Sequence, residues 1–274
     1  MEGKVTKDIL ARFGLTEKQL ESILIYREVG IAKPIPLYLK GGTEYTFGAI
    51  GDTHLCSKEE RIRELLTFYR ICQKKGVKDI YHAGDILAGQ NVYSGQEFEL
   101  HTFGADSQVA YAVRNYPNIE GIRTHFILGN HCYSFFKNAG MDVGFAIAKE
   151  RPDMTYLGAF YGEVMMEKIR LIHLVHPSGG MPYSISYRAQ RIVTEISSGD
   201  KPRILLVGHL HTSYSFLYRN IFVFGVGCFE GQTPFLARKG INPVIGGWII
   251  KITFGQGRAK STTSVVSEFI PFWG

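Results

Sequence analysis

Two histidines separated by one residue follow a short apolar run late in the chain, as Gly208-His209-Leu-His211 after Ile204–Val207. Side chains two residues apart on a strand point the same way, so both imidazoles can face one point in space. Such a pair suggests a metal site, whereas the simpler interpretation is a strand end with two ordinary histidines. The choice between them depends on whether the rest of the chain supplies further ligands.

Other apolar runs of this chain also end in residues of ligand type. In chain order, the runs and the polar residues after them are Tyr45–Ile50 with Asp52 and His54, Asp79–Ala83 with Asp85, His125–Leu128 with Asn130 and His131, Arg170–Val175 with His176, and Arg203–Val207 with His209 and His211. Ligand crevices in open α/β sheets lie at the carboxyl ends of strands, so we expect these residues along one edge of a sheet. Carboxylates and imidazoles suit divalent ions such as Mn, Fe and Zn.

In this order the residues resemble the calcineurin-like metallophosphoesterase superfamily, whose pattern is D-x-H, G-D, G-N-H-D/E, a lone H, and G-H-x-H. The resemblance runs from about Thr46 to Cys228 and rests on the motifs alone. It implies an α/β fold, a two-layer β-sandwich flanked by helices in four αββα layers. It also implies a site for two divalent metal ions, with Mn favoured and Fe, Zn, Ni or Mg as alternatives.

The resemblance also implies a role for each residue. Asp52, His54 and His211 are expected to hold one ion. Asn130, His176 and His209 are expected to hold the other, and Asp85 to bridge the two. His131 is expected beside the substrate phosphate, where it stabilises the transition state or protonates the leaving oxygen. Substrate-binding residues are not indicated.

Such a pair of ions suits phosphoester hydrolysis. Two cations about 3.5–4 Å apart share a hydroxide, lower its pKa and clamp the phosphoryl oxygens for in-line attack. Asn130 contributes a neutral oxygen, which preserves the positive charge of the ions. One position departs from the superfamily pattern: Cys132 stands where Asp or Glu usually follows G-N-H. If that acid normally orients His131, the expected role of His131 is the part put in doubt.

The residues after the G-D motif bear on the substrate. Serine/threonine phosphatases of this superfamily carry an arginine there, within G-D-x-V-D-R-G, that grips a phosphomonoester dianion. Here the run is Gly84-Asp-Ile-Leu-Ala-Gly-Gln90, without that acid or arginine. This favours a phosphodiesterase, and Asp52-Thr-His-Leu55 is similar to the D-x-H-L start of repair nucleases, which makes DNA or RNA a candidate substrate. A phosphomonoesterase and a non-catalytic partner-binding scaffold remain as alternatives.

The elements that position these residues can be outlined from the apolar pattern. A helix is expected between the first two runs, capped by Ser57 with Glu60 and ended by Gly76, so those two runs form a parallel strand pair. The residues after Gly231 are expected to form antiparallel strands. Residues 1–40 predict a small helical appendage and a linker at Lys33-Pro-Ile-Pro-Leu, and residues 41–274 the metallophosphoesterase domain. The charges of the appendage cancel, which favours docking over DNA recognition.

The remaining histidines have simpler interpretations. His173 lies an odd number of residues before His176, so the two face opposite sides of a strand, and His176 has the looped context that a ligand needs. His82 and His125 lie within strands and are expected to be satisfied there. His101 belongs to the segment between Asp85 and Asn130, which is either part of the substrate groove or a surface excursion.

Composition places the chain among intracellular globular proteins. The first thirty residues lack a signal-peptide pattern, and no apolar run is long enough to cross a membrane. The four cysteines show no CxxC pairing and are expected to be reduced thiols, so the cytoplasm is the expected compartment. No protein partner is indicated.

The formal net charge of +6 is concentrated near the end of the chain. Between Gly231 and Ser267 there is no acidic residue, and the basic residues there are Arg238, Lys239, Lys251, Arg258 and Lys260. This stretch either attracts a phosphate-rich partner along the approach to the metals or forms a solvated basic face.

Overall fold

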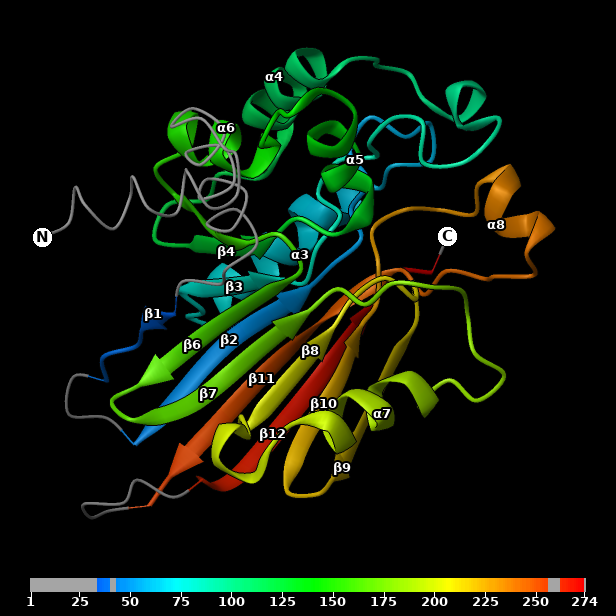
Figure 1. The fold of residues 1–274 in the computed structure, drawn as a ribbon. Helices are drawn as coiled ribbons and strands as arrows, with labels where there is room; N and C mark the ends of the chain where they lie inside the picture. The colour runs from blue at the N-terminus through cyan, green and yellow to red at the C-terminus, as the bar shows by residue number, and fades with distance from the viewer. Residues whose placement is uncertain (1–33, 40–42, 256–261, 274) are drawn as a thin grey trace, which may run out of the picture.

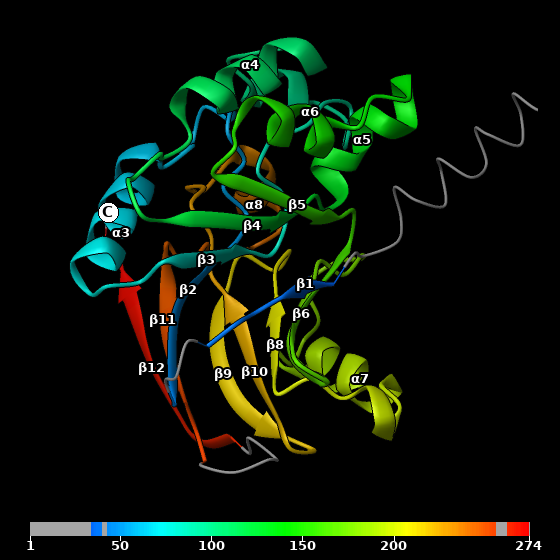
Figure 2. The ribbon, with the colours of Figure 1, turned by 90° about the vertical axis from the view of Figure 1, so that its left-hand side faces the viewer.

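Two six-stranded sheets pack face to face in the computed structural model, which describes residues 34–39, 43–255 and 262–273 (Figures 1 and 2). Helices cover both outer faces. This arrangement confirms the predicted α/β fold, a two-layer β-sandwich flanked by helices. The helices predicted near the N-terminus lie outside the described residues.

The first sheet supplies three of the five strands that end in predicted site residues. Across the sheet its strands are β12 (Thr262–Pro271), β11 (Gly246–Phe254), β2 (Glu44–Ile50), β3 (Asp79–His82), β4 (Arg123–Ile127) and β5 (Met154–Gly158). Strands β2 to β5 are parallel to one another, as the strand–helix–strand pattern predicts for β2 and β3, and β11 is antiparallel to β2.

The second sheet supplies the other two. Across the sheet its strands are β1 (Ile35–Pro36), β6 (Tyr161–Met166), β7 (Ile169–Val175), β8 (Ile204–Val207), β10 (Ile221–Val226) and β9 (Ser213–Tyr218). Strands β7 and β8 are parallel neighbours. The expectation of a single sheet edge is therefore wrong: the predicted site residues follow strands of two sheets whose carboxyl ends meet. Part of the predicted linker forms β1, which pairs with β6, while the division of the chain at residue 40 stays a prediction.

Neighbouring residues of one strand enter different hydrophobic cores. In β3, Ile80 packs under the helices of the first sheet and Tyr81 packs between the sheets. In β8, Leu206 packs between the sheets and Leu205 packs under the helix of the second sheet. Because both faces of β8 are buried, all four of its residues are apolar, whereas β3 also buries Asp79 and His82. Each fully buried aliphatic side chain contributes roughly 1.5–3 kcal/mol.

The helices divide between the two sheets. Those packed on the first sheet are α3 (Ile62–Lys74), α4 (Ala105–Asn115), α5 (Asn130–Ala139) and α6 (Val143–Glu150). Helix α7 (Tyr187–Glu195) covers the second sheet (Figure 2). The short helices η1 (Gln96–Glu99), η2 (Ser198–Asp200) and α8 (Pro234–Arg238) complete the described elements. Within the described ranges, none of the helices has the length and apolar character needed to cross a bilayer.

One local prediction was wrong and another was incomplete. Helix α3 begins at Ile62, not after a Ser57 cap, because the Glu60 carboxylate accepts a hydrogen bond from the Cys56 amide at 2.7 Å and so closes a turn before the helix. The residues after Gly231 form the predicted antiparallel strands, β11 and β12, but helix α8 comes before them. Its N-cap is Thr233, whose hydroxyl accepts a hydrogen bond from the Leu236 amide at 3.2 Å.

Candidate metal centre

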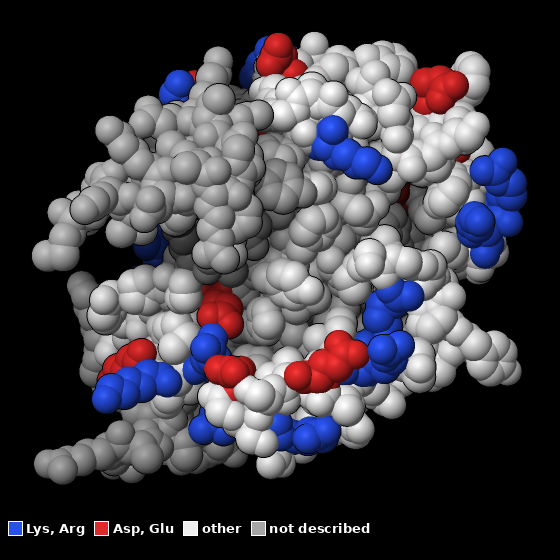
Figure 3. All heavy atoms as spheres, viewed as in Figure 1, with Lys and Arg blue, Asp and Glu red and all other residues white. Residues whose placement is uncertain are grey.

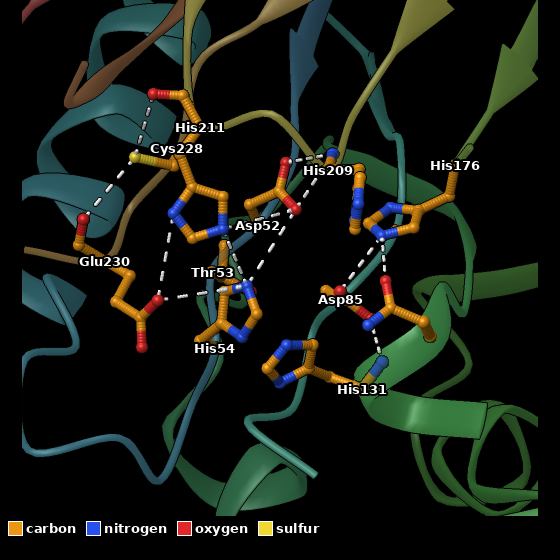
Figure 4. A network of polar contacts seen from close by, with 12 residues as sticks. Asp52, Thr53, His54, Asp85, His131, His176, His209, His211, Cys228 and Glu230 are labelled. Atoms are coloured by element: carbon orange, nitrogen blue, oxygen red, sulfur yellow. Dashed lines mark hydrogen bonds and ion pairs between the residues drawn. The ribbon is translucent and has the colours of Figure 1, made fainter. Parts of the chain in front are cut away.

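The fold brings together the residues that the strand-end pattern singles out (Figure 4). They come from the loops after β2, β3, β7 and β8 and from the first turn of α5: Asp52, His54, Asp85, Asn130, His131, His176, His209 and His211. The two sheets are linked at this point because both carboxylate oxygens of Asp52 accept a hydrogen bond from the His209 amide, at 3.1 and 2.8 Å.

Asp52, His54 and His211 form one possible ligand group. The Nε2 atoms of the two histidines lie 3.1 Å apart, and Oδ1 of Asp52 lies 3.9 Å from Nε2 of His54 and 3.7 Å from Nε2 of His211. Three donor atoms from two loops, after β2 and after β8, thus converge on one point. The donors are two imidazoles and a carboxylate, a set that fits a divalent transition-metal ion.

A second group lies beside it and comprises Asp85, His176 and His209. Nε2 of His176 lies 3.0 Å from both Oδ2 of Asp85 and Oδ1 of Asn130. The other ring nitrogen, Nδ1, donates to the backbone carbonyl of Ala83 at 2.9 Å, which aims Nε2 at the group. His209 uses Nε2 to donate to the Gly179 carbonyl at 2.6 Å and so has Nδ1 available as a ligand atom.

Asp85 belongs to the second group and also lies close to His54 of the first. Its Oδ1 accepts hydrogen bonds from the amides of His131 at 2.8 Å and Cys132 at 3.4 Å, at the N-terminus of α5. Besides its group with His176 and His209, it forms a further one with His54 and His131. This central position is the one that a bridging carboxylate needs.

The backbone at these residues is strained. Five of the predicted ligands have a positive φ: Asp52 at 49°, His54 at 42°, Asp85 at 56°, His209 at 78° and His211 at 50°. Each such residue costs on the order of 1–3 kcal/mol, and residues of this kind cluster at functional sites. The surrounding fold therefore holds these side chains in place against a local conformational preference.

Two glycines of the motifs allow the backbone to approach predicted ligands closely. A Cβ atom at Gly84 would lie 2.3 Å from Nδ1 of His176, and one at Gly129 would lie 2.5 Å from Oδ1 of Asp85. Both residues also have a positive φ, of 103° and 85°. A larger residue at either position would displace a predicted ligand.

Burial keeps most of these imidazoles neutral, which is the form that binds a metal. Burial, helped by the neighbouring imidazoles, lowers the pKa of His211 to about 3 and of His209 to about 4, and holds the pKa of His54 well below its ordinary value. Burial also acts to lower the pKa of His176, but the charge and hydrogen bond of Asp85 outweigh it and raise that pKa to about 9.

His131 lies at the surface of the cluster, where it lines a cavity with His54 and Asp85. Its Nδ1 donates to the Ala88 carbonyl at 2.7 Å, which leaves Nε2 for the cavity. Cys132 is buried instead, and its sulfur accepts a hydrogen bond from the Leu87 amide at 3.2 Å. The orientation of His131 therefore comes from a backbone carbonyl and requires no acid at position 132.

Glu230 is a buried carboxylate of this site that the sequence reasoning missed. Its Oε2 lies 3.8 Å from Nδ1 of His211 and 4.0 Å from Nε2 of His54, and burial raises its pKa to about 8. Glu230 follows Cys228 and Phe229 without a recognisable spacing to the other motifs, so the sequence offered no signal for it.

Four other histidines lie outside the two groups. Nε2 of His82 lies 3.1 Å from the Thr53 hydroxyl, and Nε2 of His125 lies 2.9 Å from Asp79. His173 faces a second cavity beside α7. His101 forms a hydrogen bond of 2.9 Å with Thr102.

The sequence model of the calcineurin-like phosphoesterase family matches residues 45–213, the segment that holds all eight predicted site residues. The chain belongs to this family. It is also 28% identical over 245 residues to the DNA polymerase II small subunit of Archaeoglobus fulgidus, an alignment that covers 72% of this chain and 49% of that protein. The chain thus spans about half the length of this relative.

Solved structures with a similar arrangement include an archaeal phosphodiesterase, at 11% identity and a TM-score of 0.45, covering 82% of this chain and 99% of that one. Another is Vps29 of Entamoeba histolytica complexed with zinc, at 14% identity and a TM-score of 0.38, covering 82% of this chain and 98% of that one.

Proposed function

We propose that this phosphoesterase uses two divalent metal ions to hydrolyse phosphodiester bonds, with nucleic acid as the substrate. The observation that carries the proposal is the pair of neighbouring ligand groups, one of which contains Asp85, close to His54 of the other. Bound there, the ions would activate water and draw charge from the phosphoryl oxygens. Manganese suits this mixed set of carboxylate, amide and imidazole donors, and Fe, Zn, Ni and Mg are the alternatives.

Each of the predicted site residues has a role in the proposed reaction. Asp52, His54 and His211 would hold one ion, and Asn130, His176 and His209 would hold the other. Asp85 would serve both ions, and its carboxylate is fixed by the first amides of α5. His131 directs Nε2 toward the cavity, where it carries the proton that the leaving oxygen takes up.

The lining of the cavity supports a diester over a monoester. A phosphomonoester dianion is usually gripped by arginine, which pairs with it through two hydrogen bonds. Among the described residues that line this cavity there is no arginine, and the one lysine is Lys239. A diester carries one charge fewer and needs less clamping.

The substrate class is supported by the relative named as a DNA polymerase subunit. The four cysteines are buried and free, which fits a reducing compartment, and we propose the cytoplasm as the place of action.

A substrate panel tests this proposal. The purified chain is assayed with mono- and diester chromogens and with single- and double-stranded DNA, each with Mn, Mg, Zn and Ni. We expect hydrolysis of the diester and of DNA that depends on added metal and is strongest with Mn. Preference for the monoester would indicate a phosphatase. Absence of turnover with every metal would indicate a non-catalytic scaffold.

A further inference from the structure

The cavity beside the metal centre has an apolar wall that the proposed chemistry does not use. Val92 and Tyr93 come from the segment after β3, and Phe235, Leu236 and Ile241 come from α8 and the residues after it. The Tyr93 and Phe235 rings are stacked, with centroids 4.0 Å apart and planes at 17°. Two segments far apart in sequence thus build one aromatic surface at the cavity.

This surface is held in place by Glu99. One carboxylate oxygen of Glu99 accepts a hydrogen bond from the Tyr93 hydroxyl at 2.7 Å, and the other accepts one from the Phe235 amide at 2.8 Å. Helix η1, which contains Glu99, accordingly lies beside α8 (Figure 1). Because the rings are fixed before any ligand binds, little side-chain entropy is lost when a planar group packs on them.

The wall lies next to the residue proposed to protonate the leaving oxygen. The ring centroids of Tyr93 and His131 are 6.1 Å apart. At the other end of the wall, Nζ of Lys239 lies 5.9 Å from the centroid of Phe235. Basic side chains also gather over α8 in Figure 3, and Arg238 and Lys239 belong to or follow this helix. A metal centre, an aromatic surface and a cation thus follow one another along the cavity.

We propose that the Tyr93–Phe235 wall binds the nucleobase next to the scissile phosphate and that Lys239 contacts the following phosphate. This inference rests on the proposed function and names its substrate as a strand with unpaired bases. A single-stranded nucleic acid alternates phosphates with planar bases, and such bases stack on aromatic side chains. The cavity volume of about 610 Å³ is within the range of sites for ligands of nucleotide size.

Two small ligands that differ only in the base test this proposal. Dissociation constants of adenosine 5′-monophosphate and ribose 5-phosphate are measured by calorimetry on the full chain with Mn. Stacking of one base contributes roughly 1–3 kcal/mol, so we expect the nucleotide to bind about tenfold or more tightly than the sugar phosphate. Equal affinities in the wild-type protein would overturn the proposal.

Variants of the wall locate the effect. Phe235→Leu and, as a second variant, Tyr93→Leu keep an apolar side chain but remove an aromatic ring, and should reduce the preference for the nucleotide to about threefold or less. Phe98→Leu is the matched control, since Phe98 is 76% exposed and does not line the cavity. Thermal melting shows whether each variant is folded. An unchanged preference in both folded wall variants would overturn the proposal.

Failure of the base-binding proposal can be distinguished from failure of the proposed phosphodiesterase function. A protein that hydrolyses a chromogenic diester but binds both ligands equally has the activity without the base subsite. A protein that prefers the nucleotide, with the preference lost in the wall variants, but hydrolyses no diester has the subsite without the activity.

Discussion

Strand β3 has an aspartate at each end, and the two lie in very different surroundings. Asp79, at the first residue, accepts hydrogen bonds from Arg123 at 2.9 Å and Tyr45 at 3.2 Å, and pairs with His125 at 2.9 Å. Asp85, just beyond the last residue, is fixed by the amides of α5 and faces imidazole nitrogens that point toward one another across the site.

The backbone conformation distinguishes the two ends of β3 even more clearly. Asp79, Arg123 and His125 lie in strands, whereas Asp85 and four other predicted ligands have a positive φ. Both ends contain buried carboxylates and imidazoles, so burial of polar groups alone does not mark a functional site. The mark is strained backbone together with donor atoms that converge on one point.

The largest effect is expected from Asp85→Asn. Turnover of a small diester should fall by about 10²-fold or more, because Asp85 is proposed to serve both ions. Metal content, measured by inductively coupled plasma mass spectrometry, should fall for both ions. Asp79→Asn is the matched control and should keep both metal content and turnover. If Asp85→Asn keeps two tightly bound ions and full turnover, the bridging assignment is wrong.

His131→Ala should lower turnover by about 10²-fold, the usual contribution of a positioned acid, while the metal content stays unchanged. His125→Gln, beside the opposite end of β3, should leave turnover unchanged, because His125 contacts Asp79 and lies outside the cavity. Loss of metal from His131→Ala would show that His131 is itself a ligand.

Asp79→Asn should lower the free energy of unfolding at pH 7 by about 1–3 kcal/mol, since it weakens hydrogen bonds to a buried charge. Burial acts to raise the pKa of Asp79, but the hydrogen bond and charge of His125 and the charge of Arg123 outweigh it, and the pKa lies below its ordinary value of 3.8. The stabilisation is therefore present above pH 3.8 and disappears as the pH falls through the lowered pKa. Urea unfolding at pH 7 and pH 3 should show the difference between wild type and variant shrinking in acid, and a constant difference would contradict this origin.

The smallest effect concerns the basic stretch, which the structure divides. Lys239 lines the cavity, Lys251 pairs with Glu44 at 3.2 Å near the start of β2, and Arg258 and Lys260 lie outside the described residues. The hypothesis that the whole stretch follows the approach to the metals is therefore wrong for Lys251.

Lys239→Met should flatten the salt dependence of single-stranded DNA binding by about 0.7 log–log units, the value for one phosphate contact, and Lys251→Met should not. Fluorescence anisotropy at several salt concentrations measures both slopes. Equal slopes for the two variants would remove Lys239 from the binding path.

The sequence predicted those features that depend on one segment at a time. The apolar runs located the strands, and the polar residue at each strand end located the cluster, including the choice of His176 over His173. The prediction failed where the conformation of a residue depends on a partner far away in the sequence. The Glu60 carboxylate accepts hydrogen bonds from the Cys56 amide and from the Tyr111 hydroxyl of α4. These contacts close a turn, so α3 starts later than the capping pattern indicates.

The site residues that were not predicted also depend on contacts between segments far apart in the sequence. Glu230 joins the cluster only because the second sheet brings the residues after β10 to the ends of β2 and β8. The stack of Tyr93 on Phe235 requires Glu99 to join two segments separated by more than a hundred residues. Asp and His adopt a positive φ more often than most other residues, but their types alone do not predict it at Asp52 and His54.

Anomalous diffraction from crystals soaked in Mn²⁺ would locate the proposed ions. We predict two peaks about 3.5–4 Å apart, with Asp85 between them. One peak should lie at Asp52, His54 and His211, and the other at the group that contains His176 and His209. A single peak, or two peaks away from these groups, would contradict this prediction.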